Sequence, residues 1–293
     1  MSRQTEYPKY FLLGVEVDAL TIEQAISYII DRATNPAQPA CYVVKPYVEF
    51  MDRAANNAAL RQILNQAELA LPDGIALLWA AAYWYNGRRS WARFWRSLSA
   101  IILAPQTLRQ PLPERFGGIS FTWPLLQAAA QRRASVFLIG KESPAAAEAL
   151  AEHLRRQLPG LDIIGALSGH DPGRPAGQVS EHWIQNTLQA LQQAQPDIVL
   201  VGMGFPLQEH VISRFAPQLS HGVLIGEGGT FDYEQFGGHR RKAPPTMQRL
   251  GLEWLWRLLL EPRRFRRQLA IPRFIWRVWR SQTIHRHPGH DVT

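Results

Sequence analysis

The sequence has little cysteine, no long apolar run and no clustered histidines, and each feature argues against a class of protein. Its single cysteine, Cys41, cannot form an intramolecular disulfide, which indicates a reducing compartment. No segment approaches the roughly 20 consecutive apolar residues that span a bilayer. Residues 1–17 are polar where a secretory leader needs an apolar centre. We therefore expect any membrane contact to be made from the cytoplasmic side.

Positive charge is concentrated near the carboxyl end. The 293 residues carry a formal net charge of +8, and the isoelectric point is near 10.0. Residues 239–293 hold 13 Lys and Arg against 3 Asp and Glu, which leaves the first 238 residues slightly acidic. Such a basic segment favours an anionic partner, either nucleic acid, phospholipid or a phosphorylated substrate.

Short apolar runs alternate with amphipathic segments up to about residue 240. The runs "ACYVV", "SVFLIG", "DIVLVG" and "GVLIG" are each followed by a polar or glycine-containing turn and a helical pattern. This order predicts an α/β, Rossmann-like fold with a mainly parallel sheet and helices on both faces. We expect an α/β core over residues 1–240 and a basic helical appendage over residues 241–293.

In such sheets ligands bind beyond the carboxyl ends of the strands. That rule selects residues 44–49, 72–74, 140–143, 202–209 and 226–232.

The segment "VGMGFPLQEH" places two glycines, Gly202 and Gly204, directly after a predicted strand. Glycines there allow backbone N–H groups to approach a diphosphate, and the next helix offers its positive end. A dinucleotide-binding motif needs a third glycine where this chain has Leu207, which argues against a dehydrogenase. A plain tight turn remains the alternative, although it leaves the following Pro-x-Gln-Glu unexplained.

Two acidic features have both structural and chemical interpretations. In "LPDGIALL", Asp73 is either a helix N-cap or a general base at the mouth of the sheet. In "TFDYEQ", Asp232 and Glu234 are either a chance pair or ligands for a divalent ion. Because the nine histidines add no ligand-spaced cluster, we expect no bound metal. We also expect no cofactor.

Residues 88–113 interrupt the α/β pattern with Arg and Trp. Trp91, Trp95, Leu98 and Ile102 share one face of a predicted helix, and arginines lie off that face. Such a segment is either a core helix with a solvated basic edge or a helix at a membrane interface.

Six blocks in order resemble the WecG/TagA/CpsF glycosyltransferase family over about residues 10–270. They are "PDGIALL", "PERFGG", "VFLIGKESPAAAEALAEHL", "VGMGFPLQEH", "GEGGTFDY" and "KAPPTMQRLGLEWLWRLLLEPRRFRRQ". The resemblance implies metal-independent transfer of a sugar, with inversion, from a UDP-sugar to a polyprenyl-diphosphate-linked glycan acceptor during bacterial surface-polysaccharide synthesis. It also implies a cytoplasmic, peripheral enzyme on the inner face of the bacterial cell membrane, and it suggests a homo-oligomer.

The resemblance also implies roles for individual residues. Asp73 matches the catalytic base, Gln208 a polar residue of the active-site pocket, and Asp232 the residue that reads the uracil. The C-terminal arginines would neutralise the diphosphate, a role suited to the guanidinium fork. The remaining basic and Trp residues would contact an anionic membrane surface. The expected substrate-binding residues are Lys45, Tyr47, Gly74, Arg115, Gly140, Gly202, Gly204, Gln208, Gly228, Asp232, Arg257, Arg264 and Arg267.

One block departs from the family pattern. The usual Thr-x-Asn-x-Glu reads "KPYVE", with Lys45 and Tyr47 at the Thr and Asn positions. This leaves open a second hypothesis, a membrane-tethered nucleotide-sugar-binding scaffold without catalysis. A third, a nucleic-acid-binding module that uses the basic tail, does not explain the glycine-rich blocks, and we expect no nucleic-acid partner.

Overall fold

The computed structural model describes residues 7–85, 90–249, 253–260, 265, 269–281 and 285–286. The chain divides into two compact units that alternate along the sequence. The first unit comprises residues 1–22, 45–116 and 242–293, and the second comprises residues 23–44 and 117–241. The expected division into a core of residues 1–240 and an appendage of residues 241–293 stays a prediction.

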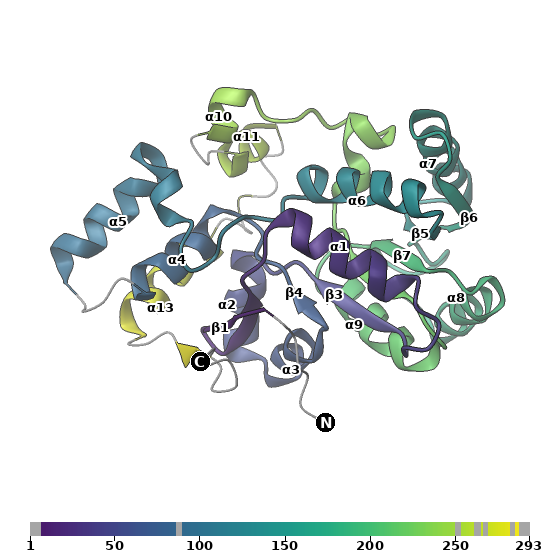
Figure 1. Cartoon of the computed structure of the whole chain (residues 1–293), viewed down its shortest axis with the longest axis horizontal. Helices are drawn as coiled ribbons and strands as arrows, with labels where there is room; N and C mark the ends of the chain where they lie inside the picture. The colour runs from purple at the N-terminus through teal and green to yellow at the C-terminus, as the bar shows by residue number, and fades with distance from the viewer. Residues whose placement is uncertain are drawn as a thin grey trace. The chain divides into compact units, whose positions relative to one another are not determined.

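A parallel sheet forms the centre of the second unit (Figure 1). Among the described residues of this unit its order is β3-β8-β7-β5-β6, and each neighbouring pair is parallel. The strands are β3 (Cys41–Val44), β5 (Ser135–Gly140), β6 (Asp162–Leu167), β7 (Ile198–Gly202) and β8 (Val223–Gly226). The central strands are buried almost throughout because helices cover them, which explains their continuous apolar sequences. The predicted α/β fold with a parallel sheet is confirmed.

The helices of the second unit begin at recognisable caps. Ser143 accepts a hydrogen bond from the N–H of Ala146, and Ser180 accepts one from the N–H of Trp183. The α-helices are α1 (Ile22–Ala33), α6 (Gly118–Arg132), α7 (Pro144–Gln157), α8 (Glu181–Ala194) and α9 (Leu207–Phe215). Short 3-10 turns are η2 (Ala216–Gln218), η3 (Thr230–Asp232) and η4 (Glu234–Phe236).

The first unit begins with a hairpin. Strands β1 (Lys9–Leu12) and β2 (Val15–Asp18) pair antiparallel, and β9 (His285–Arg286) pairs with the other edge of β1. Leu13 and Gly14 both have positive φ, 52° and 84°, as a tight two-residue hairpin turn requires. The hairpin buries Val15 and Val17 on one face.

An apolar helix, α4 (Ile75–Tyr85), forms the core of the first unit. Its sequence is hydrophobic on every side, and Leu77 to Trp84 are buried. The other helices are α2 (Val48–Asn56), α3 (Ala58–Gln66), α5 (Trp91–Leu103), η1 (Pro105–Leu108), α10 (Pro245–Arg249), α11 (Glu253–Leu260) and α13 (Ala270–Arg280), and the unit also contains the short strand β4 (Leu69–Ala70).

Helix α5 turns most of its predicted apolar face outward. Trp91 is 61% exposed, Trp95 60% and Ile102 46%, while Phe94 is the buried aromatic residue of the helix. The interpretation of this face as a core face is therefore wrong. No helix in the described part of the chain combines the length and apolarity that a membrane span requires.

Candidate active site

Three loops of the first unit converge through two backbone hydrogen bonds. The N–H of Asp73 donates to the carbonyl of Pro46 at 2.8 Å, and the N–H of Phe116 donates to the carbonyl of Pro72, also at 2.8 Å. These bonds tie the loop that carries Lys45 and Tyr47 and the loop that carries Arg115 to the loop of Asp73. The structure therefore brings together the three loops that carry Lys45 and Tyr47, Asp73 and Gly74, and Arg115.

The Asp73 loop turns directly into helix α4. Asp73 is half-buried, and Gly74 has a φ of +89°, a conformation that favours glycine. A Cβ at Gly74 would meet no atom within 4 Å, so the space beside it is open. The loop thus presents a carboxylate next to an uncrowded backbone at the start of a buried helix.

The residues at the atypical positions differ in their surroundings. Lys45 follows β3 and is buried. The Tyr47 hydroxyl donates to Oε2 of Glu49 at 2.9 Å, and Arg53 pairs with Oε1 of the same carboxylate at 2.8 Å. The Tyr47 ring also packs edge-on against Phe50. Tyr47 is therefore held against the first turn of α2.

A buried acid that the sequence analysis missed supports the Asp73 loop. Oδ2 of Asp18 accepts a hydrogen bond of 2.7 Å from the N–H of Ala70, the last residue of β4. Its Oδ1 lies 3.4 Å from Nζ of Lys9, and both side chains are buried. Burial raises the pKa of the Asp18 carboxyl to about 6, although Lys9 opposes the shift. The sequence signal for this residue is that Asp18 ends the alternating apolar and polar residues of "VEVD".

In the second unit, two predicted glycines lie beneath an aromatic ring. Gly140 and Gly202 are register partners at the carboxyl ends of β5 and β7. A Cβ at Gly140 would lie 2.8 Å from the Phe231 ring, and one at Gly202 would lie 2.5 Å from it. These glycines are required because the ring of η3 packs directly on the ends of both strands.

Gln208 joins the loops that follow β7 and β8. Its Oε1 accepts hydrogen bonds from the N–H groups of Gly204 at 3.1 Å and Gly228 at 2.8 Å, and its Nε2 donates to Glu209 at 2.8 Å. Gly204 and Gly228 have positive φ, and a Cβ at either would meet open space. Buried Gln208 therefore fixes two glycine turns whose outer sides are uncrowded.

Asp232 lies between two cations of the second unit. Its carboxylate is 3.8 Å from Nζ of Lys141 and 3.2 Å from Nη1 of Arg240. Lys141 also donates to the carbonyl of Phe231 at 2.6 Å, and Arg240 donates to the carbonyl of Gly229 at 3.1 Å. Lys141 and Arg240 thus contact a predicted site residue, and the sequence analysis did not name either of them, although Lys141 lies in the selected segment 140–143.

The acidic pair of "TFDYEQ" does not converge on one centre. Asp232 pairs with Lys141 and Arg240, whereas Glu234 pairs with Arg241 at 3.3 Å. Within the part of the chain that the structure describes, no three His, Cys, Asp or Glu side chains form a group suited to a metal ion.

The predicted C-terminal arginines lie wholly or partly outside the described residues. The backbone of Arg257 belongs to α11, but its side chain lies outside the described residues. Arg264 and Arg267 also lie outside them.

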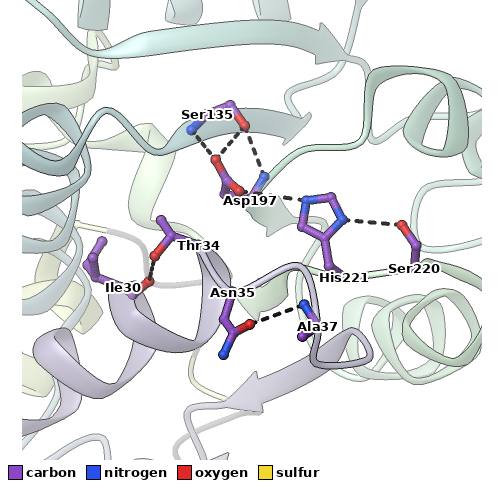
Figure 2. Close-up of polar contacts among 8 residues, drawn as sticks. All are labelled: Ile30, Thr34, Asn35, Ala37, Ser135, Asp197, Ser220 and His221. Carbon is purple, nitrogen blue, oxygen red and sulfur yellow. Dashed lines mark hydrogen bonds and ion pairs between the residues drawn. The ribbon is translucent and has the colours of Figure 1, made fainter.

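A polar cluster apart from the predicted site residues lies at the amino ends of the strands (Figure 2). Oδ2 of Asp197 accepts hydrogen bonds from the N–H and the hydroxyl of Ser135, at 2.7 and 2.8 Å. His221 lies 3.6 Å from Oδ1 of Asp197, and its Nδ1 is 3.2 Å from the Ser220 hydroxyl. In a hydrolytic triad Nδ1 faces the carboxylate, so this ring has the reverse orientation. The cluster connects the starts of β5, β7 and β8.

Comparison with known proteins gives consistent matches along the chain. The family model described as "Glycosyl transferase WecG/TagA/CpsF family" matches residues 10–95 and 99–288. A protein of Bacillus spizizenii is 27% identical over 85% of this chain and 82% of its own length. One of Staphylococcus aureus strain MRSA252 is 25% identical over 94% of this chain and 93% of its own length. Both are named N-acetylglucosaminyldiphosphoundecaprenol N-acetyl-beta-D-mannosaminyltransferase.

Proposed function

Because the chain belongs to the glycosyl transferase WecG/TagA/CpsF family, it is a glycosyltransferase, and we propose that it moves a sugar from a UDP-sugar to a polyprenyl-diphosphate-linked acceptor. The relatives' names support an acceptor of the N-acetylglucosaminyl-diphospho-undecaprenol type. Such a lipid-linked product would serve the assembly of a bacterial surface polysaccharide.

Asp73 is the proposed general base. Its carboxylate takes the proton of the acceptor hydroxyl as the hydroxyl oxygen attacks the anomeric carbon. The bond between that carbon and the diphosphate oxygen breaks, and its electron pair leaves with UDP. A single displacement of this kind inverts the anomeric configuration. The half-buried Asp73 and the open space beside Gly74 support this assignment.

The glycine turns of the second unit are proposed to bind the donor. Gln208 fixes Gly204 and Gly228, so their shape is set before a ligand arrives. Lys141 and Arg240 supply positive charge in the same unit, near the residue proposed to read the uracil, Asp232. This preformed arrangement is the observation that best supports a nucleotide-sugar donor.

Arginines are proposed to stabilise the departing UDP in place of a metal ion. Guanidinium groups bind diphosphate oxygens through paired hydrogen bonds. The proposed residues for this role are Arg115, Arg257, Arg264 and Arg267. Lys45, which is buried, completes the proposed set together with Tyr47, Gly140 and Gly202.

We place the enzyme on the inner face of the cell membrane, where its lipid-linked acceptor lies. The basic residues near the carboxyl end support attraction to anionic lipid. Assembly into a homo-oligomer remains a proposal that sedimentation equilibrium would test.

A transfer assay tests the proposed function. Purified protein, a panel of radiolabelled UDP-sugars and a short-chain prenyl-diphospho-N-acetylglucosamine are expected to give a labelled lipid product, with inverted configuration by NMR. The reaction is expected to persist in excess EDTA. Binding of a UDP-sugar without turnover would indicate the non-catalytic scaffold, and the absence of both would contradict the proposal.

A further inference from the structure

Helix α5 exposes four large apolar side chains. The exposed fractions are 61% for Trp91, 60% for Trp95, 46% for Ile102 and 79% for Leu103. Arg96 of the same helix is also exposed. We call these five residues the α5 face. Clustered exposed apolar groups of this size are uncommon on proteins that contact only water.

The opposite side of α5 fixes the orientation of this face. Phe94 is buried and packs edge-on against Trp79 and Tyr83 of α4. The Trp79 indole N–H also donates to the Ser97 hydroxyl at 3.0 Å. Because α4 is the buried core helix of this unit, α5 is held with its other side outward.

Helix α13 extends the α5 face. The rings of Trp91 and Trp279 have centroids 4.0 Å apart, and those of Phe94 and Trp279 are 4.9 Å apart. Helix α13 adds exposed Trp276, with the Arg280 guanidinium 4.7 Å above its ring. Figure 1 shows α5 in blue and α13 in yellow beside α4.

The charge of this surface has one sign. Neither Trp91–Leu103 nor Ala270–Arg280 contains an acidic residue. Asp52 of α2 pairs with Arg273 and Arg277, at 2.8 and 3.3 Å. Among the described residues, no ion pair joins exposed Arg96 or exposed Arg280 to a carboxylate.

We propose that the α5 face, together with Trp276 and Arg280, docks on an anionic phospholipid surface. Indole rings favour the headgroup region, aliphatic side chains enter the acyl boundary, and arginines pair with lipid phosphates. A second copy of the chain would bring arginines against arginines, which disfavours self-association through this face. Nucleic acid would match the arginines but would leave Ile102 and Leu103 in water.

This inference deepens the proposed function, because docking would place the enzyme on the surface that holds its lipid acceptor. Nothing in the docking itself requires transfer chemistry. The two proposals can therefore fail independently.

Vesicle co-sedimentation of the full chain tests the proposal. Vesicles of phosphatidylcholine with phosphatidylglycerol are compared with vesicles of phosphatidylcholine alone. We expect binding to the anionic vesicles, and a loss of at least about tenfold in partitioning for the variant Trp95→Gln/Ile102→Gln/Leu103→Gln. Arg96→Gln is expected to weaken partitioning about fivefold, because it removes one positive charge that would face the lipid.

The control variant replaces one exposed apolar residue and one exposed arginine of the second unit. Ile164 is 37% exposed on β6, and Arg156 is exposed on α7. The variant Ile164→Gln/Arg156→Gln is expected to bind vesicles like the wild type. Circular dichroism and thermal melting establish that all variants fold, and hydrogen exchange is expected to show vesicle-dependent protection over residues 91–103.

Unchanged vesicle binding by the triple variant, or protection that spares residues 91–103, would overturn the docking proposal. Dimerisation through the α5 face, or preferential binding of DNA over anionic vesicles, would overturn it equally. Transfer to a short-chain, water-soluble acceptor is expected to survive in the triple variant. If the wild type did not transfer sugar to that acceptor, the result would count against the proposed function and would leave the docking proposal intact.

Discussion

The Asp18 carboxylate accepts a 2.7 Å hydrogen bond from the N–H of Ala70, three residues before Asp73. This bond connects the amino-terminal hairpin to the loop that carries the proposed base. The pKa of Asp18 is raised to about 6, chiefly because the carboxyl is buried. The support of the loop is therefore sensitive to pH.

Replacement of Asp18 by Asn is expected to change the pH dependence of stability. Between about pH 4 and pH 6 the folded chain keeps the Asp18 proton that the unfolded chain has released. The free energy of unfolding of the wild type therefore falls as pH rises through this window, by about 3 kcal/mol relative to Asp18→Asn. Urea unfolding from pH 4 to pH 7 measures the difference. A difference that is flat with pH would refute this account, and Asp162→Asn, at the exposed first residue of β6, is the matched control.

Gln208→Met is expected to loosen the two glycine turns. Methionine keeps the length of the side chain but leaves the N–H groups of Gly204 and Gly228 without their acceptor. We expect a loss of about 1–3 kcal/mol in stability, together with a higher KM for the UDP-sugar. Exposed Gln192→Met is the control. An unaltered donor KM in Gln208→Met would mean that these turns do not bind the donor.

Gly202→Ala is expected to displace the Phe231 ring. The added Cβ would lie 2.5 Å from a ring carbon, so we expect a cost of about 2 kcal/mol or more. Adding Phe231→Leu should recover about 1 kcal/mol of this cost in a double-mutant cycle. In Gly204→Ala the added Cβ would meet open space, and the expected cost comes from the positive φ of this residue. Adding Phe231→Leu should therefore leave that cost unchanged. Equal coupling of both glycines to Phe231 would contradict the packing explanation.

Asp197→Ala is expected to destabilise the second unit without affecting catalysis. The substitution removes the acceptor for the N–H and the hydroxyl of Ser135, which should cost about 1–3 kcal/mol (Figure 2). Because the cluster lies at the amino ends of the strands, kcat/KM should stay within about twofold of the wild type under folded conditions. A stable variant with lost turnover would assign this cluster a catalytic role.

The order of strands and helices could be read from the sequence because each element has a local signal. Continuous apolar runs such as "SVFLIG" indicate buried strands, and Ser143 before Pro144 indicates a helix start. The outward orientation of Trp91 and Trp95 could not be read, because periodicity shows which residues share a face but not what covers it. Asp18 was missed for the same reason, since its partners Lys9 and Ala70 depend on the hairpin and on a distant strand.

The rate of sugar transfer by Asp73→Asn tests the central claim most directly. Asparagine preserves the size of the side chain but cannot accept the proton of the acceptor hydroxyl, so we expect kcat to fall by about 10²–10⁴-fold. Binding of the UDP-sugar, measured by calorimetry, should stay near the wild-type value, and Asp162→Asn should retain full activity. Wild-type turnover by a folded Asp73→Asn variant would contradict the assignment of Asp73 as the base.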